Sequence, residues 1–289
     1  MGAGMTLTDS LTYTTEDIEY LRHGDRPMMM RLFRPVGDGP FPVVLDLHGG
    51  AWCNGDLSEC AKRDAALAEA GIAGASLDFR HAGDGYPTSL IDINFAVRYL
   101  KANAAKLGLD PDRVAITGQS SGGHLAMLAA MRPLDPRYAS VPLEDGSSVD
   151  ASVRCVGMNW PVINPLSRYR RAVRLRDSDD TPAWVGDIPS RHDLYWKTEE
   201  NMEEGNPMLA LEKGEAVETP PAIWVQSQPD PVHDYRDPES PVELNEPQRF
   251  AENYKKAGGE IEIVYMDKSG RDTHEAIDPI VAFFRKQLL

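Results

Sequence analysis

The amino-acid sequence predicts an α/β fold with a mostly parallel central sheet flanked by helices. Short β-branched and apolar runs alternate with helix-forming segments along most of the chain. Several of these runs are apolar at nearly every position, as is usual for strands that are covered on both faces. The 289 residues fit one large domain with a substantial core. We therefore expect residues 1–289 to form a single domain.

The expected elements follow in a regular order. Residues 11–20 and 28–34 suit two antiparallel strands, the second of which ends at Pro35. Further strands, expected to be parallel, cover 41–47, 73–79, 114–117, 153–158, 222–226 and 260–266. The expected helices cover 58–70, 88–107, 124–130, 245–257 and 279–288. In the last of these helices, Asp278 is the expected N-cap and Pro279 the first helical residue.

Residues 161–219 interrupt this alternation. The segment contains several prolines, a group of arginines and several aromatic residues, among them Trp184, Tyr195 and Trp196. A long irregular insertion in a compact domain usually serves a function. Because open α/β sheets bind ligands at the carboxyl ends of their strands, we expect this segment to form a lid or cap there.

A Gly-x-Ser-x-Gly motif lies between an expected strand and an expected helix, at Gly118, Ser120 and Gly122. In this context the motif indicates a nucleophile elbow, in which a serine occupies the apex of a sharp turn. The two glycines leave room for the strand and the helix to approach closely. We therefore expect Ser120 to be a nucleophile; the alternative is a surface serine in a tight turn.

A second glycine-rich segment, His48-Gly49-Gly50-Ala51-Trp52, directly follows the expected strand 41–47. Without side chains, the two glycines allow backbone N–H groups to come close to a substrate carbonyl oxygen. The N–H groups of Gly49, Gly50 and Ser121 would then form an oxyanion hole. The alternative is an ordinary turn at the end of a strand.

Several residues are candidates for the base and the acid that a serine nucleophile needs. His274 is the expected base, since it lies in a polar loop after the last expected strand, and His233 is a weaker second choice. His124 is expected to pack on the helix behind the serine. Asp230 follows the end of an expected strand and is the expected acid, with Asp234 as the alternative. The order Ser, Asp, His is the one found in α/β-hydrolases.

The chain resembles the hormone-sensitive-lipase-like esterases among the α/β-hydrolases, and most of all the acetylxylan and feruloyl esterase type. The resemblance spans about residues 40–289, and Ala51 stands where many relatives have a third glycine. It implies an α/β-hydrolase fold, ester hydrolysis, and a triad of Ser120, Asp230 and His274. The matching motifs are His48-Gly49-Gly50-x-Trp52, Asp78-Phe79-Arg80, Tyr86-Pro87, Gly118-x-Ser120-Ser121-Gly122-Gly123-His124, Pro220-Pro221, Asp230 and His274.

Aromatic and basic residues suggest what lies around this site. Four tryptophans could line an acyl or aryl pocket, or they could pack the cap onto the body. These residues are Trp52, Trp160, Trp184 and Trp196. One arginine of the 161–219 segment is a candidate for binding a substrate carboxylate, the alternative being a solvated surface paired with acidic residues. These arginines are Arg168, Arg170, Arg171, Arg174 and Arg176.

We therefore expect a serine carboxylesterase that hydrolyses small short-chain acyl or aryl esters through an acyl-enzyme, without a metal or cofactor. An amidase or arylformamidase with the same triad is the alternative among enzymes, and a non-catalytic small-molecule receptor is the alternative outside them. The net charge of −15 argues against nucleic acid and anionic membranes as partners.

The remaining expectations concern location and assembly. The sequence shows no secretory signal and no apolar run long enough to span a membrane. Cys53, Cys60 and Cys155 form no Cys-x-x-Cys pair, so we expect reduced thiols in a cytoplasmic protein. A homodimer is compatible with the sequence.

Overall fold

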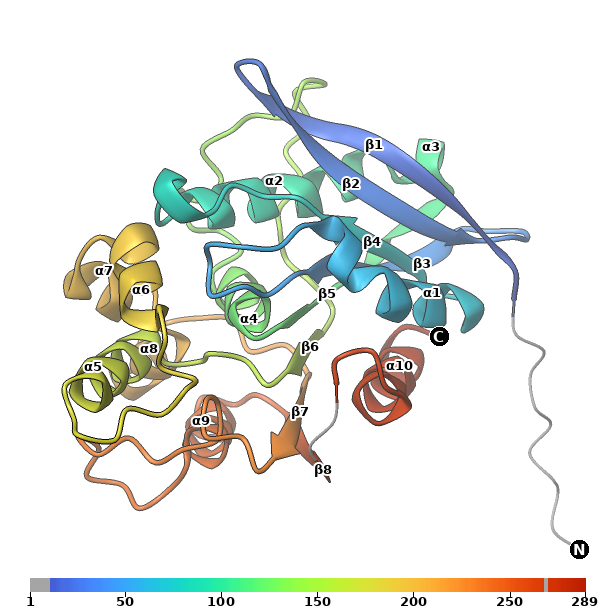
Figure 1. Cartoon of the computed structure of the whole chain (residues 1–289). Coiled ribbons are helices and arrows are strands. Elements are labelled where there is room, and N and C mark those ends of the chain that lie inside the picture. Colours follow the sequence, from blue (N-terminus) through green and yellow to red (C-terminus); the bar gives the residue numbers. More distant parts are fainter. Residues whose placement is uncertain (1–10, 268–269) are drawn as a thin grey trace, which may run out of the picture.

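The computed structural model describes residues 11–267 and 270–289. Its centre is an eight-stranded sheet in the order β1-β2-β4-β3-β5-β6-β7-β8. β1 (Tyr13–His23) and β2 (Arg26–Pro35) pair antiparallel, and β2 pairs antiparallel with β4 (Figure 1). All other neighbours are parallel, so the predicted fold class is confirmed. The parallel strands are β3 (Phe41–Leu47), β4 (Ala73–Leu77), β5 (Leu109–Gln119), β6 (Val156–Asn159), β7 (Ala222–Gln228) and β8 (Ile261–Asp267).

Helices cover both faces of the sheet, which divides the core in two (Figure 1). Alternate side chains of a strand point to opposite faces. In β3, accordingly, Val44 packs in one cluster with Phe284, whereas Val43 and Leu45 belong to the larger cluster on the other face. The helices of the body are α1 (Ala61–Glu69), α2 (Thr88–Ala102), α3 (Ala104–Leu107), α4 (Ser121–Met131), α9 (Glu246–Lys256) and α10 (His274–Leu288), and 3-10 turns cover Leu57–Cys60 and Ala82–Asp84.

The 161–219 segment is helical rather than irregular. Its helices are α5 (Pro165–Arg176), α6 (Ile188–Trp196), α7 (Glu199–Glu204) and α8 (Pro207–Glu212), which lie together on one side of the molecule (Figure 1). Pro165, Pro189 and Pro207 lie at the first or second position of α5, α6 and α8, because the fixed backbone angle of proline suits the start of a helix. Asn164 and Asn206 cap two of these helices by accepting hydrogen bonds from Ser167 N and Leu209 N, both at 3.1 Å.

The last helix begins earlier than predicted, at His274 rather than Pro279. The sequence Asp278-Pro279 has the form of an N-cap followed by a first helical proline. In the structure, however, the N–H groups of Ala276 and Ile277 bond to the carbonyl of Thr273, which starts the helix there. Pro279 therefore lies inside α10. This shift matters because it changes the position of His274.

Two further findings concern sequence-based expectations. All three cysteines are free, and Cys60 and Cys155 are buried. No helix within residues 11–267 and 270–289 is long and apolar enough to cross a membrane.

Candidate active site

Ser120 lies at the junction of β5 and α4, at the centre of a sharp turn. Its φ of 52° is in the left-handed region of backbone angles, which residues other than glycine rarely adopt. A Cβ atom on Gly122 would overlap the carbonyl groups of Leu47 and His48 at the end of β3, and one on Gly118 would overlap Gly122 itself. Glycine at these two positions therefore lets β5, α4 and β3 meet around the serine, as the motif predicted.

A histidine and an aspartate continue from Ser120 in a chain of hydrogen bonds. Ser120 Oγ lies 3.1 Å from His233 Nε2, and His233 Nδ1 lies 2.8 Å from Asp230 Oδ2. Because a carboxylate can only accept, Nδ1 carries the proton of the neutral ring. Nε2 is then the acceptor, and the serine hydroxyl donates to it. This is the arrangement that a general base requires.

The loop after β7 holds Asp230 in place. Asp230 Oδ1 accepts hydrogen bonds from the N–H groups of Val232 and His233 at 3.0 and 3.2 Å, and Oδ2 accepts one from Gln226 Nε2 at 3.2 Å. Burial raises the pKa of this carboxyl, but His233 and the backbone donors lower it more, to about 2. Asp230 is therefore ionised and keeps the imidazole in one orientation. For His233, burial lowers the pKa more than Asp230 raises it.

The structure does not place His274 as the base. As the first residue of α10, its side chain is 95% exposed and lies 3.4 Å from Asp278. The turn at Asp230 instead puts His233, three residues later, between the acid and Ser120. The alternative acid, Asp234, is engaged elsewhere, since it accepts hydrogen bonds from Gln228 and Asn245 at 2.8 Å. The Asp-x-x-His spacing was the sequence signal for this pair.

Two of the expected oxyanion donors, Gly49 and Ser121, lie directly beside the serine. A Cβ atom on Gly49 would lie 3.2 Å from the carbonyl of Gln119 and 3.5 Å from Ser120 Cβ, so this loop adjoins the elbow. Gly50 has a φ of 99°, and its carbonyl accepts hydrogen bonds from Cys53 N and Asn54 N in a tight turn. Among the described residues, the N–H groups of Gly49, Gly50 and Ser121 have no acceptor. They are thus available to a substrate oxygen.

The tryptophans pack rather than line an open pocket, contrary to the acyl-pocket expectation. Trp52 and Trp196 are fully buried and meet edge to face at 5.3 Å. Trp52 Nε1 donates to His124 Nδ1 at 3.2 Å, and His124 Nε2 donates to the carbonyl of Gly205 at 2.8 Å. His124 therefore packs behind the serine, as expected. The rings of Trp52, in the oxyanion loop, and Trp196, in α6, thus pack against each other in the core. Neither ring is exposed to contact a substrate.

The other two tryptophans also lie in packed surroundings. Trp160 is buried just after β6, and its backbone N–H donates to the carbonyl of Val225 at 2.8 Å. Trp184 is half-buried, and the Arg171 guanidinium lies over its ring, 4.8 Å from the centroid. Trp184 therefore packs within the 161–219 segment, and Trp160 is buried where the chain leaves β6.

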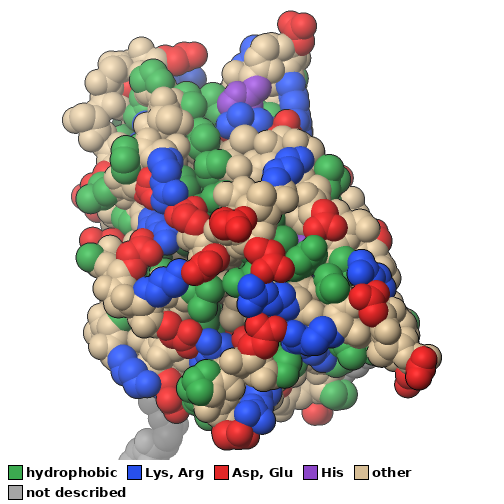
Figure 2. All heavy atoms as spheres, turned by 90° about the vertical axis from the view of Figure 1, so that its left-hand side faces the viewer, with side chains coloured by type: hydrophobic (Ala, Val, Ile, Leu, Met, Phe, Trp, Pro, Cys, Tyr) green, Lys and Arg blue, Asp and Glu red, His purple; other side chains and the backbone are tan. Residues whose placement is uncertain are grey.

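Most arginines of α5 are paired at the surface. Arg170 contacts Glu199 at 2.7 Å and Glu239 at 2.9 Å, and Arg174 also pairs with Glu239. Arg176 contacts its neighbour Asp177 at 2.8 Å. Figure 2 shows the corresponding face, on which basic and acidic side chains alternate. The expectation of a solvated, charge-paired surface therefore describes these three residues.

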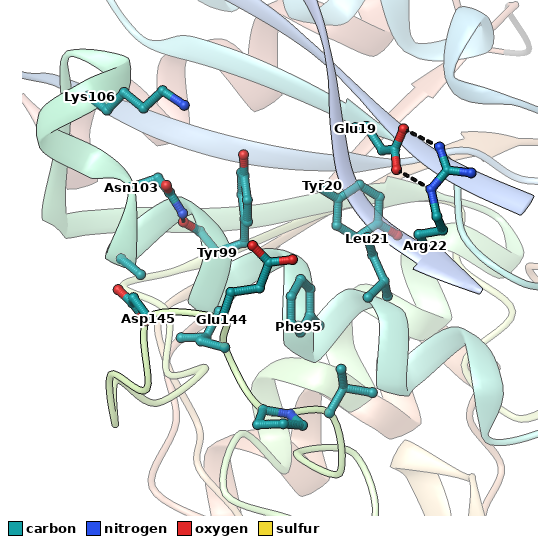
Figure 3. Close-up of a pocket in the computed structure, with 14 residues that line it drawn as sticks. Glu19, Tyr20, Leu21, Arg22, Phe95, Tyr99, Asn103, Lys106, Glu144 and Asp145 are labelled. Carbon is teal, nitrogen blue, oxygen red and sulfur yellow. Dashed lines mark hydrogen bonds and ion pairs between the residues drawn. The ribbon is translucent and has the colours of Figure 1, made fainter. Parts of the chain in front are cut away.

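One pocket lies away from Ser120, between β1, α2 and the loop at 141–145 (Figure 3). It measures about 440 Å³, and Tyr20, Phe95 and Tyr99 contribute aromatic surface to it. None of the residues assembled around Ser120 lines this pocket. Over the described ranges, no three His, Cys, Asp or Glu side chains gather as metal ligands would.

Curated relatives match part of the chain. Probable carboxylic ester hydrolase LipM of Mycobacterium tuberculosis is 36% identical over 146 residues, which are 49% of this chain and 34% of LipM. Esterase LipC of the same organism is 36% identical over 123 residues, 41% of this chain and 30% of LipC. The matched part thus spans about a third of these relatives.

Solved structures match nearly the whole chain. The carboxylesterase EstE1, cloned from a metagenomic library, superposes with a TM-score of 0.73 at 22% identity and covers 98% of this chain and 92% of EstE1. The esterase of the archaeon Pyrobaculum calidifontis gives a TM-score of 0.71 at 22% identity, covering 96% and 87%. The BD-FAE family model matches residues 31–235. The chain therefore belongs to the BD-FAE family and has the α/β-hydrolase fold.

Proposed function

We propose that this protein is a serine carboxylesterase that hydrolyses small carboxylic esters. The observation that carries the proposal is the hydrogen-bonded chain from Ser120 through His233 to Asp230, which begins at the elbow beside unpaired backbone donors. Membership of the BD-FAE family and the esterase names of the relatives support the same reaction.

Each group has a defined task in this reaction. Ser120 Oγ attacks the ester carbonyl carbon while its proton passes to His233 Nε2, and Asp230 stabilises the resulting imidazolium. The N–H groups of Gly49, Gly50 and Ser121 stabilise the negative charge on the carbonyl oxygen. The C–O bond then breaks, and His233 returns the proton to the leaving alcohol. A water molecule, activated by the same histidine, releases the acid from Ser120.

The 161–219 segment is proposed to act as a cap over this site. The chain leading into α5 lies against the nucleophile, since Val162 N donates to the carbonyl of Ser120 at 3.1 Å. Further along, Tyr235 in the acid loop donates to Ser167 Oγ of α5 at 3.2 Å. The segment therefore contacts both the nucleophile and the loop that carries His233 and Asp230, and it is in a position to shape the substrate site.

Two measurements test the proposal. A fluorophosphonate should label one serine, and peptide mapping should locate the label on Ser120; Ser120→Ala should abolish both labelling and ester hydrolysis. A panel of 4-nitrophenyl acetate to octanoate, set against formyl- and acetyl-anilides, should show the higher kcat/KM for esters. Absence of labelling in folded protein would rule out the enzyme, and a preference for anilides would indicate an amidase.

We also propose a cellular location and an oligomeric state to test. The three free cysteines support a reducing compartment such as the cytoplasm. A homodimer is proposed only as the state to test, by light scattering after size exclusion.

A further inference from the structure

One arginine of α5 differs from the others because it is buried and has no acidic partner. Arg168 is only 3% exposed. Within the part of the chain that the structure describes, its Nε and Nη1 atoms have no hydrogen-bond partner. Burial lowers its pKa to about 10, so the guanidinium is still charged at neutral pH. A buried charge without a partner is costly and is normally paired.

Arg168 lies beside the triad. It occupies the first turn of α5, six residues after Val162, whose N–H bonds to the Ser120 carbonyl. Its charge acts on both Asp230 and His233, and it lowers the pKa of His233. The neighbouring Ser167 accepts a hydrogen bond from Tyr235, in the loop that carries both catalytic candidates. The unpaired cation is therefore buried beside the loop that carries Asp230 and His233, close enough for its charge to act on both.

A second unsatisfied polar atom lies in the same place. His192 is fully buried on α6, and its Nδ1 donates to the carbonyl of Ile188 at 2.8 Å. Its Nε2 is therefore an acceptor, and this atom has no partner among the described residues. Burial and the charge of Arg168 lower the pKa of His192 to about 3, so the ring is neutral. Near one another, a buried donor and a buried acceptor thus both lack a hydrogen-bond partner among the described residues, which is unusual for a packed interior.

We propose that Arg168 is a specificity-determining residue that binds a carboxylate group of the ester substrate. The inference rests on the proposed esterase function and names its substrate class, esters that carry a free carboxylate in the acyl or the alcohol part. The guanidinium presents planar paired donors that match a carboxylate. In a chain with a net charge of −15, attraction of an anion must come from such a local cation rather than from the overall field.

Matched ester pairs test this assignment in the intact protein. The first pair is the mono-4-nitrophenyl ester of glutarate and its methyl ester, which differ only in a carboxylate on the acyl side. The second is 3-acetoxybenzoate and its methyl ester, with the carboxylate on the alcohol side. In at least one pair, the wild-type kcat/KM should favour the anionic member by roughly tenfold or more. The pair that shows this preference identifies the side of the substrate that Arg168 reads.

Variants separate binding from structure. Arg168→Met should reduce the preference for the anionic ester by roughly 10- to 100-fold, and Arg168→Lys should restore part of it. The control is Arg176→Met on the same helix, since Arg176 is exposed and its one ion pair within residues 11–267 and 270–289 is with Asp177; here the preference should be unchanged. Should the methionine variant not fold, the wild-type ratio and the lysine variant decide.

Two results would overturn the inference. One is equal wild-type kcat/KM for both members of both pairs. The other is an equal loss on anionic and neutral esters in Arg168→Met, which would show that Arg168 serves the fold. In either case the esterase proposal stands, because it requires only hydrolysis and labelling of Ser120. Failure to cleave any of these esters, with no labelling, would instead contradict the esterase itself.

Discussion

The choice between two histidines as the base can be tested by replacing each with asparagine. The structure places His233 Nε2 at 3.1 Å from Ser120 Oγ and its Nδ1 at 2.8 Å from Asp230. His274 lies at the exposed start of α10, with Asp278 as its neighbour. The sequence favours His274 and the geometry favours His233, so the two replacements have opposite expected results.

The expected magnitudes follow from these contacts. Without His233, nothing accepts the Ser120 proton in the attack and nothing returns a proton to the leaving alcohol. General acid–base catalysis contributes typically about 10²- to 10⁴-fold, and loss of a triad member can cost more. We therefore expect His233→Asn to lower kcat by at least about 10³-fold. The described contact of His274 is an exposed pair with Asp278, which contributes about 1 kcal/mol or less to stability and does not involve Ser120. The kcat of His274→Asn should therefore stay within about twofold of the wild-type value.

The assay is the steady-state hydrolysis of 4-nitrophenyl acetate, with thermal unfolding to confirm that both variants are folded. The rate of fluorophosphonate labelling provides a second readout, since it reports the reactivity of Ser120 without a deacylation step. A large loss in His274→Asn together with near-normal activity in His233→Asn would refute the assignment. It would show that the loop before α10 brings His274 to the serine in the active protein.

Three further predictions concern pH and stability. Because the base must be neutral and burial lowers the pKa of His233, kcat/KM should rise with pH to a plateau, with an apparent pKa below 6.5 in the pH profile. Gly122→Ala, whose Cβ overlaps the end of β3, should lower the free energy of unfolding in urea by about 1–3 kcal/mol or more, whereas Gly83→Ala, with open space around it, should change it little. Burial raises the pKa of Glu246 to about 8, so the wild type should lose stability as pH rises from about 4.5 to 8. Glu246→Gln should remove that loss, so its free energy of unfolding relative to wild type should rise by up to roughly 4 kcal/mol across this pH range. If the difference between variant and wild type in urea unfolding were the same at all pH values, it would contradict the raised pKa of Glu246.

The sheet could be predicted because its signals are local. The buried strands are almost continuously apolar, and Phe41–Leu47 agrees with its predicted bounds at both ends. The errors in the predicted helix bounds include a helix start, where one short motif is compatible with two starting residues. Asp278-Pro279 has the form of a helix start, yet α10 begins at His274, since the N–H groups of Ala276 and Ile277 bond to the carbonyl of Thr273. The helices of the 161–219 segment were missed because their prolines mark starts as readily as breaks.

The nucleophile and the acid could be proposed from the sequence because each is tied to the end of a strand. The base could not, because its position depends on how a loop folds in three dimensions. His233 reaches Ser120 only because Asp230 turns the chain, with Asp234 N bonded to the Asp230 carbonyl at 2.8 Å. Three positions after an aspartate, a histidine can face the same way as the acid. That spacing carries information which the order Ser, acid, His alone does not.

The helical spacing of the sequence indicates that Arg168 lies on a different face of α5 from its exposed arginines. Counting the arginines of the segment does not show this difference. Residues three and four apart share one face of a helix. Ala172 follows Arg168 by four positions and is buried, and Leu175 follows by seven and is half-buried. Arg170 and Arg174 lie on the exposed face with their glutamates. A cation on the apolar face of an amphipathic helix must be paired, be functional, or weaken the fold. With no acidic partner among the described residues, Arg168 is the residue of α5 whose replacement should change which esters the proposed esterase selects.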